Sequence, residues 1–274
     1  MFKKRRADAP IISTIMLMAI TLFAMSITLS YVNSTLTRRQ GENDFESAKI
    51  FMKNLGLQID DVAWTKGRVD TVHFTSQYGQ IEYLPDTIQY TITYKNETNT
   101  VATQVYKSSI FMFNVPTEKY YLDEGYYESL LPTEVTSLVF YGESAPATRV
   151  FAIQKSAVGG NNFLRIVIVP ILRLRNYTVT ITGSTLRYVR IYLPELEQGS
   201  ASPLPKSVVL TGQSIRTETI QNITGIDVRV DFLRNGTLYD NEFFKFPDIT
   251  QTITFTGISQ VETYVGSVKL DYGA

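Results

Sequence analysis

The chain has 274 residues, with 26 Lys and Arg against 26 Asp and Glu, no Cys and a single His, His73. Its length and its 44% content of hydrophobic residues suffice for one large or two modest folded domains and exclude a disordered tail. The lack of Cys excludes disulfides, thiolate metal sites and Cys nucleophiles, and a single His excludes a metal site with two His ligands. We therefore expect a protein that is not an enzyme, with no catalytic, cofactor-binding or metal-binding residues.

An uncharged stretch of 22 residues extends from Ile11 to Val32. As a helix it is about 33 Å long, which is sufficient to cross a lipid bilayer once. A basic cluster, Lys3–Arg6, closely precedes it, so the positive-inside rule predicts a cytoplasmic N-terminus and an extracellular remainder. Outside that cluster the chain has a small acidic excess, which does not indicate nucleic acid as a partner.

A secretory signal peptide is the alternative interpretation of this stretch. Its apolar region is usually about 7 to 15 residues long and ends in a small-x-small cleavage site. Here the apolar stretch is longer, and Tyr31-Val32-Asn33 is a poor match to such a site. We therefore predict a transmembrane helix over residues 8–36.

The residues that lead into the helix, Arg5-Arg6-Ala7-Asp8-Ala9-Pro10-Ile11-Ile12, resemble the N-terminus of archaeal type IV pilin-like proteins. In that family a basic pair and a small residue precede the cleavage site, and a short segment with Pro leads into the helix. The resemblance implies that a prepilin-type peptidase reads Arg5 and Arg6, removes Ala7 as the last leader residue, and leaves Asp8 as the new N-terminus. It also implies that the chain assembles with other pilin-like subunits.

Within the apolar stretch, small residues recur at intervals of seven, three and four: Thr14, Thr21, Ala24 and Thr28. Such spacing forms a narrow face on which another helix can pack closely in lipid. The alternative is that the threonines are simply tolerated there, because their hydroxyls can bond to their own backbone.

A second helical pattern follows over residues 37–66. Its apolar residues recur every three or four positions and predict an amphipathic stalk helix: Phe45, Ala48, Met52, Leu55, Ile59 and Val62. Gly41 lies between the two patterns, so they form either one long helix with a soft point or two helices with a joint. The apolar stripe packs either on the chain's own β region or on another subunit.

From Arg68 onward the apolar residues alternate instead, as in Ile88, Tyr90, Ile92 and Tyr94. No convincing helical pattern follows Trp64. We expect Trp64 itself to anchor the end of the stalk helix on the sheet. The predicted fold is therefore α+β: a long N-terminal helix followed by an all-β antiparallel sandwich region. Pro170, in the apolar stretch Phe163–Leu174, indicates a bulge or an edge strand.

The predicted domain organisation follows from these patterns and from a segment rich in Pro, Gly and Ser. It consists of a leader (1–7), a transmembrane helix (8–36), a stalk helix (37–66), a β-sandwich domain (67–193), a possible linker (194–206) and a second β region or continuation of the sandwich (207–274).

Five Asn residues begin N-x-Ser/Thr sequons: Asn33, Asn96, Asn176, Asn222 and Asn235. In an extracellular domain the last four are candidate glycan acceptors near strand ends, whereas Asn33 is too close to the membrane. A Thr-rich β protein also generates sequons passively. Asn235-Gly236 further predicts a type I′ hairpin turn.

An acidic cluster and an aromatic cluster could suggest binding sites, but each has a simpler structural explanation. The adjacent carboxylates Asp60-Asp61 are expected to diverge into solvent, and the tyrosines of the segment Tyr120–Tyr127 are expected to cap the core. No nucleotide-binding or hydrolase motif is present in the sequence.

Together these patterns predict a non-enzymatic pilin-like subunit, or a minor component, of a surface filament. The alternative is an uncleaved single-span membrane protein whose extracellular β-sandwich serves in the envelope, in adhesion or as a motor scaffold. Its expected partners are the membrane, a prepilin-type peptidase, and other pilin-like subunits or envelope proteins.

Overall fold

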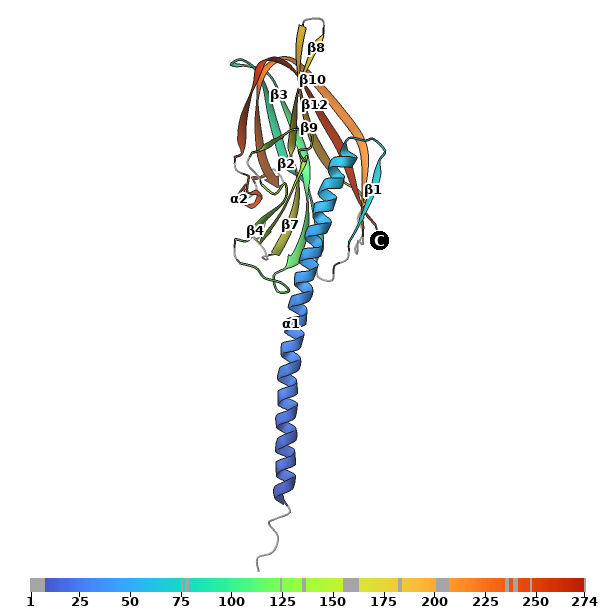
Figure 1. The fold of residues 1–274 in the computed structure, drawn as a ribbon, viewed down its shortest axis with the longest axis vertical. Helices are drawn as coiled ribbons and strands as arrows, with labels where there is room; N and C mark the ends of the chain where they lie inside the picture. The colour runs from blue at the N-terminus through green and yellow to red at the C-terminus, as the bar shows by residue number, and fades with distance from the viewer. Residues whose placement is uncertain are drawn as a thin grey trace, which may run out of the picture.

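The computed structural model describes residues 8–74, 76, 79–123, 125–134, 137–154, 163–181, 184–200, 207–234, 237–238, 241–246 and 248–273. Its first element is one continuous helix of 56 residues, α1 (Asp8–Ala63). Figure 1 shows the second half of α1 lying against a β-rich head, while the first half projects away from it. The two predicted helical segments therefore form one helix without a joint.

We call residues 69–273 the head; its described residues form strands, connecting loops and one short helix. The strands are β1 (Val69–His73), β2 (Gln80–Asn96), β3 (Asn99–Pro116), β4 (Tyr127–Leu131), β5 (Val139–Tyr141), β6 (Thr148–Gln154), β7 (Phe163–Pro170), β8 (Leu172–Ile181), β9 (Ser184–Gln198), β10 (Ser207–Arg234), β11 (Thr237–Leu238) and β12 (Thr250–Gly273). The helix α2 (Asn241–Phe244) was not expected from the sequence, because a single turn is too short to show helical periodicity.

The described strands form one hydrogen-bonded sheet in the order β4-β6-β7-β3-β2-β10-β12-β9-β8-β5, with β1 and β11 each paired to β10. Most neighbours are antiparallel, but β9 pairs with β12 and β5 pairs with β8 in parallel. The expected antiparallel pairing therefore holds for most neighbours, but not for these two pairs. The parallel pairs join strands that are distant in the sequence, which local patterns do not report.

The strands after residue 207 belong to the same sheet as the strands before 194. β10 pairs with β2 on one side and with β12 on the other, and β12 in turn pairs with β9. The strands after residue 207 are thus hydrogen-bonded to strands on both sides of the proposed linker, and the division into domains stays a prediction. The proposed linker begins within β9, where Leu196 is buried.

The apolar stretch Phe163–Leu174 is divided at Pro170. β7 ends at this residue and pairs with β3 and β6, whereas β8 begins at Leu172 and pairs with β9 and β5. Because proline has no N–H to continue a ladder, the chain leaves one part of the sheet here and joins another. The proline thus ends a strand, and it does not form a bulge within one.

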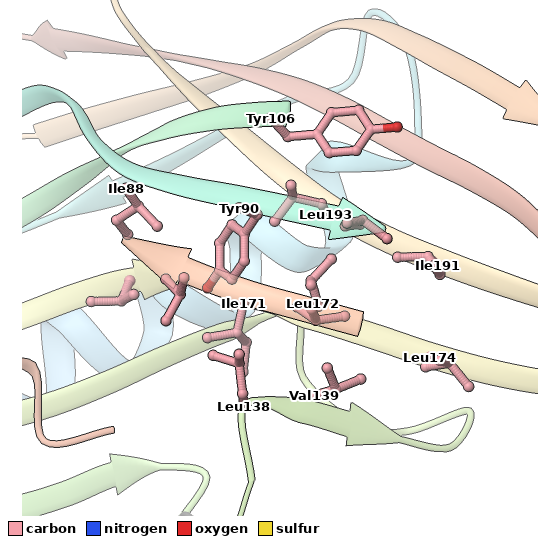
Figure 2. Close-up of a cluster of buried hydrophobic side chains, with 14 of the residues drawn as sticks. Ile88, Tyr90, Tyr106, Leu138, Val139, Ile171, Leu172, Leu174, Ile191 and Leu193 are labelled. Atoms are coloured by element: carbon pink, nitrogen blue, oxygen red, sulfur yellow. The ribbon is translucent and has the colours of Figure 1, made fainter. Parts of the chain in front are cut away.

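Two hydrophobic clusters stabilise the head. In the first, side chains from β2, β8 and β9 point into one space, as Figure 2 shows for Tyr90, Leu172 and Leu193. The Tyr90 hydroxyl is buried there and donates a hydrogen bond to the carbonyl oxygen of Pro170, at 2.9 Å. The four alternating residues predicted to face one side, Ile88, Tyr90, Ile92 and Tyr94, are all fully buried in this cluster.

The second cluster joins α1 to the outer face of the sheet. All six residues of the predicted stripe, from Phe45 to Val62, are buried in it against Leu196, Leu210 and Val268. The stripe therefore packs on the chain's own sheet. Removing this much apolar surface from water is the main term that fixes the helix on the head.

Arg149 on β6 is a fully buried cation that attaches α2 to the sheet. Its guanidinium donates to the carbonyl oxygen of Phe244, at 2.7 Å, and to that of Lys245, at 3.1 Å. It also donates to the Tyr127 hydroxyl and lies 4.9 Å from the centre of the Phe151 ring. Burial lowers the pKa of Arg149, and the Tyr127 hydroxyl partly offsets this effect.

Candidate functional site: the two halves of the long helix

The first half of α1 is exposed: from Ile12 to Leu36, every residue except the half-buried Thr35 is exposed. Residues 12–36, called here the bare half, include exposed large apolar side chains such as Leu17, Phe23 and Tyr31, which are 68%, 69% and 71% exposed. Among the described residues this helix alone is long and apolar enough to cross a membrane, with a mean hydropathy of 2.1 in its most apolar part. A membrane anchor and a signal sequence share these properties.

The predicted small-residue face lies on the bare half, and all four of its residues are exposed. The Thr21 hydroxyl donates to the Leu17 carbonyl oxygen at 2.7 Å, and the Thr28 hydroxyl donates to that of Ala24 at 2.8 Å. Both hydroxyls are therefore satisfied within the helix and need no partner helix in lipid. Close packing along Thr14, Thr21, Ala24 and Thr28 stays a prediction, which now depends on their small size alone.

The predicted processing site lies at the start of the same helix. Arg5, Arg6 and Ala7 are outside the described residues, and Asp8 is the first residue of α1. If the chain is cut after Ala7, the new N-terminus is therefore the first residue of the helix.

Just beyond the bare half, α1 meets the head at Gly41. A Cβ atom at this position would lie 2.7 Å from the carbonyl oxygen of Lys119 and 3.0 Å from Cβ of Tyr120. The glycine thus allows the loop after β3 to approach the helix backbone, and α1 continues through it without a break. The sequence predicted a possible weak point in the helix here, because glycine lowers helix propensity. The sequence pattern alone does not distinguish a glycine that weakens the helix from one that allows close packing.

Aromatic contacts and ion pairs hold that loop and β4 on the helix. The Phe45 ring lies 5.9 Å from Tyr120 and 6.2 Å from Tyr126. Lys49 Nζ lies 3.0 Å from the Glu128 carboxylate and 2.8 Å from that of Glu46. Burial alone would lower the pKa of Lys49, but the hydrogen bonds to the two carboxylates outweigh it and raise the pKa.

A groove of about 550 Å³ opens beside this junction. One wall is a face of α1 with Asn33, Ser34, Thr37 and Arg38, and the other is the loop segment 117–121. Arg38 is exposed and forms no ion pair with any described residue. The groove therefore combines polar groups, two cations (Arg38 and Lys119) and one carboxylate (Glu118) at the point where the apolar surface of the bare half ends.

Near the other end of α1, Asp60 binds two side chains. Its carboxylate accepts hydrogen bonds from the indole N–H of Trp64, at 2.9 Å, and from Arg173 on β8, at 3.2 and 3.3 Å. The expectation that Asp60-Asp61 both diverge into solvent was wrong for Asp60, because the helix ends against β8 and β9. Trp64 packs at 5.2 Å on Tyr192, as expected of an anchor between helix and sheet.

Beyond Trp64 the same outer sheet face carries tyrosines and arginines on β8, β9 and β12. We call this the Tyr–Arg face: Arg173, Arg175, Tyr177, Tyr188, Arg190, Tyr192 and Tyr264. Its arginines are paired with Asp60, Glu143 and Glu262, so their charges are balanced locally. Arg190 lies over the Tyr177 ring at 5.0 Å. Sequence reasoning missed this face, although the alternation Tyr188, Arg190, Tyr192 is its local signal.

The predicted glycan acceptors lie on the head in different settings. Asn176 is exposed on β8, which Figure 1 places at the end of the head remote from the bare half. Asn222 is exposed at an irregularity of β10 with φ 61°, and Asn96 is half-buried at the end of β2. The Thr224 hydroxyl accepts a hydrogen bond from the Glu97 N–H at 2.5 Å, which brings these two sequons together.

Two further features from the sequence are the Asn235-Gly236 turn and the single histidine, His73. Asn235 and Gly236 are not described, although β10 and β11 pair on either side of them. His73 is exposed on β1. Among the described residues, no three His, Asp or Glu side chains come together as potential metal ligands.

In comparisons with known proteins, no family model, no curated protein and no solved structure matches this chain.

Proposed function

We propose that this protein is a pilin-like subunit or minor component of an archaeal type IV pilus-type filament, with a structural or adhesive role. In this proposal a prepilin-type peptidase removes residues 1–7 at the cytoplasmic side of the membrane. The bare half of α1 then leaves the bilayer and packs with the same helix of other subunits. The head stays outside the cell, where it forms the surface of the filament.

The observation that carries this proposal is the continuity of α1 between a bare apolar half and a half that is embedded in the head. A protein that is only tethered needs a membrane helix and a linker of any stiffness. A subunit of a regular filament needs its head at one fixed orientation to the helix, so that every copy makes the same contacts. Here no flexible linker separates the two parts.

Glycines at both ends of the contact support this rigid connection. On the helix, Gly41 and Gly56 bring the backbone close to the head, and Cβ atoms there would lie 2.7 Å from Lys119 O and from Val150 Cγ2. On the sheet, a Cβ at Gly266 would lie 2.3 Å from the carbonyl oxygen of Ala63. Close contacts of this kind restrict rotation and sliding of one packed element on another.

The test is the N-terminus of the mature protein. Full-length chain is expressed in a cell that has a prepilin peptidase, and in the same cell without it, and is taken from membranes for intact mass and N-terminal sequencing. We expect a chain that begins at Asp8 only where the peptidase is present. Replacing both Arg5 and Arg6 by Ala should block the cut, whereas the same replacement of Lys3 and Lys4 is the matched control.

A chain that retains residues 1–7 in the presence of the peptidase would overturn the processed filament subunit. It would favour the alternative, an uncleaved single-span protein that holds the same head in the envelope. If the chain is cut, electron microscopy of the cell surface should show filaments that are lost when the gene is deleted.

The same intact-mass measurement tests the proposed glycans. Extracellular exposure of the head predicts added mass that decreases when Asn176 or Asn222 is replaced by Gln. Asn96 is half-buried, so we expect its replacement to remove less mass. A measured mass equal to that of the bare polypeptide would contradict glycosylation of all these sites.

A further inference from the structure

We propose that the groove between α1 and residues 117–121 binds the phosphate of a membrane phospholipid while the bare half spans the bilayer. The proposal rests on the membrane placement of the bare half, but not on cleavage or on filament assembly. Arg38 is assigned as the residue that contacts the phosphate.

The first argument is depth. The uncharged stretch ends at Val32, and the groove residues Asn33 to Arg38 follow it by one to six positions. At about 1.5 Å per residue they lie about 2 to 9 Å beyond the hydrocarbon core. The lipid headgroup layer is about 5 to 7 Å thick on each side, so the groove opens at the level of the lipid phosphates.

The second argument is the chemistry of the groove wall. Arg38 is exposed, and a guanidinium offers two parallel N–H donors that match the oxygens of a phosphate. Asn33 and Thr37 extend the same wall with an amide and a hydroxyl. The Ser34 hydroxyl already donates to the Tyr31 carbonyl oxygen at 2.9 Å, so we assign it no contact.

The opposite wall suits an interface between lipid and water. Tyr121 is 53% exposed on the loop, and tyrosines are enriched where an apolar ring meets headgroups. Glu118 and Lys119 also line the groove, side by side on this wall, so their opposite charges largely cancel. The phosphate is therefore expected on the Arg38 side, where a volume of about 550 Å³ leaves room for its glycerol.

The third argument is that the groove is formed before any lipid binds. The loop backbone touches the helix at Gly41, and the Tyr120 ring packs on Phe45, which is fully buried. A site whose walls are already in place loses little conformational entropy on binding. A loop that merely touched the membrane would not need these contacts.

The experiment uses the full, uncleaved chain in detergent and native mass spectrometry with added phosphatidylglycerol as the probe. We compare the wild type with Arg38→Gln and with the matched control Arg39→Gln. Arg39 has the same charge and is exposed, but it does not line the groove. We expect one tightly retained lipid on the wild type and on Arg39→Gln, and about a tenfold weaker affinity for Arg38→Gln.

Three outcomes would overturn the proposal. Equal loss of binding in both variants would indicate general surface charge, and equal retention would show that Arg38 contacts no lipid. Displacement of the lipid by millimolar inorganic phosphate would assign the groove to a soluble anion instead. The unfolding midpoint of each variant is measured in parallel, and it should not change because both side chains are exposed.

A negative result for lipid binding is distinguishable from a negative result for the proposed filament function. The lipid measurement does not depend on the state of the N-terminus, so a negative result leaves cleavage and assembly untouched. Flotation of the full chain with phospholipid vesicles tests the shared premise. A chain that does not float would remove the basis of both proposals.

Discussion

The two halves of α1 have similar backbone conformations but opposite surroundings. In the bare half Leu22 and Met25 are 62% and 59% exposed, whereas Met52 and Leu55 in the embedded half are fully buried. Helical backbone satisfies its own hydrogen bonds in either setting, in lipid as well as in a protein core. The comparison shows that helix formation depends on neighbouring residues in the sequence. The contribution of each half to stability depends instead on what covers its side chains.

The largest expected effect comes from the embedded half. Leu55→Ala should reduce the free energy of unfolding of the head by about 2 to 5 kcal/mol, because it removes buried methyl groups and leaves a cavity. Leu22→Ala, the control in the bare half, should change it by less than about 0.5 kcal/mol. Urea unfolding of the full chain in detergent, followed by circular dichroism, measures both. Similar losses in the two variants would refute the division into halves.

The next effect concerns the end of the embedded half. Asp60→Asn should destabilise the head by about 2 kcal/mol, because it leaves Arg173, whose side chain is 12% exposed, without its carboxylate. Asp61→Asn is the matched control at the neighbouring position. Its carboxylate pairs with Arg68 but is 53% exposed, so its loss should cost less than about 0.5 kcal/mol. The fluorescence of Trp64, the single Trp, reports unfolding at this site. Equal effects would show that the Asp60–Arg173 pair contributes no more than the exposed Asp61–Arg68 pair.

A smaller effect tests the junction of the two halves, and here the sign of the change in the free energy of unfolding is the decisive observation. In a helix without neighbours, Gly→Ala stabilises by about 1 kcal/mol. At Gly41 the new Cβ would meet the Lys119 carbonyl oxygen, so we expect Gly41→Ala to destabilise the head by about 1 kcal/mol instead. Ser47→Ala, at an exposed position of the same helix, should be neutral or slightly stabilising. A gain of stability at Gly41 would show that the loop does not contact the helix.

The smallest expected effect is the dependence of the head on acid. Burial alone would raise the pKa of Glu262, but the hydrogen bonds from Arg190 and Tyr264 outweigh it and lower the pKa below 4.5. A carboxyl group with a lowered folded pKa stabilises the head above its unfolded pKa, and this stability is lost as the pH falls through the folded value. The unfolding midpoint should therefore decrease as the pH is lowered from the ordinary pKa of a glutamate, about 4.3, to lower values.

Variants at two carboxylates check the assignment of this acid effect. Glu262→Gln should make the midpoint less sensitive to acid. Glu195 is the opposite case, because burial raises its pKa, so Glu195→Gln should make the loss at low pH steeper. The bare half carries no ionisable group between Ile12 and Tyr31, so its insertion in lipid should not follow this dependence. A midpoint that rises in acid would contradict the proposed ion pairs.

Much of the local structure follows from the sequence. The uncharged stretch and the stripe from Phe45 to Val62 predicted both parts of α1, and alternation predicted which residues of β2 face inward. These features are local because the periods of 3.6 and 2 follow from backbone geometry. The functional resemblance also comes from the sequence alone, through Arg5, Arg6 and Ala7, and it stays a prediction.

Several features needed the tertiary structure. Gly41 has one local meaning as a weak helix former and another as a point of contact, and only the position of Lys119 decides between them. The parallel pairing of β9 with β12 joins residues more than seventy positions apart, for instance Tyr192 and Tyr264. Such pairs depend on long-range fit and on loop closure, which a local pattern does not encode.

By itself the sequence determined three features: an apolar helix, an apolar stripe from Phe45 to Val62 that must be covered, and β strands after residue 68. The tertiary structure decided that the helix is unbroken and that its stripe is covered by the chain's own sheet. It also decided that Asp60 pairs with Arg173 of the sheet, whereas Asp61 pairs with Arg68 at the surface. The physical reason is the range of the interactions. Backbone periodicity is set within a few residues, whereas burial and pairing are set by whatever the rest of the chain brings into contact.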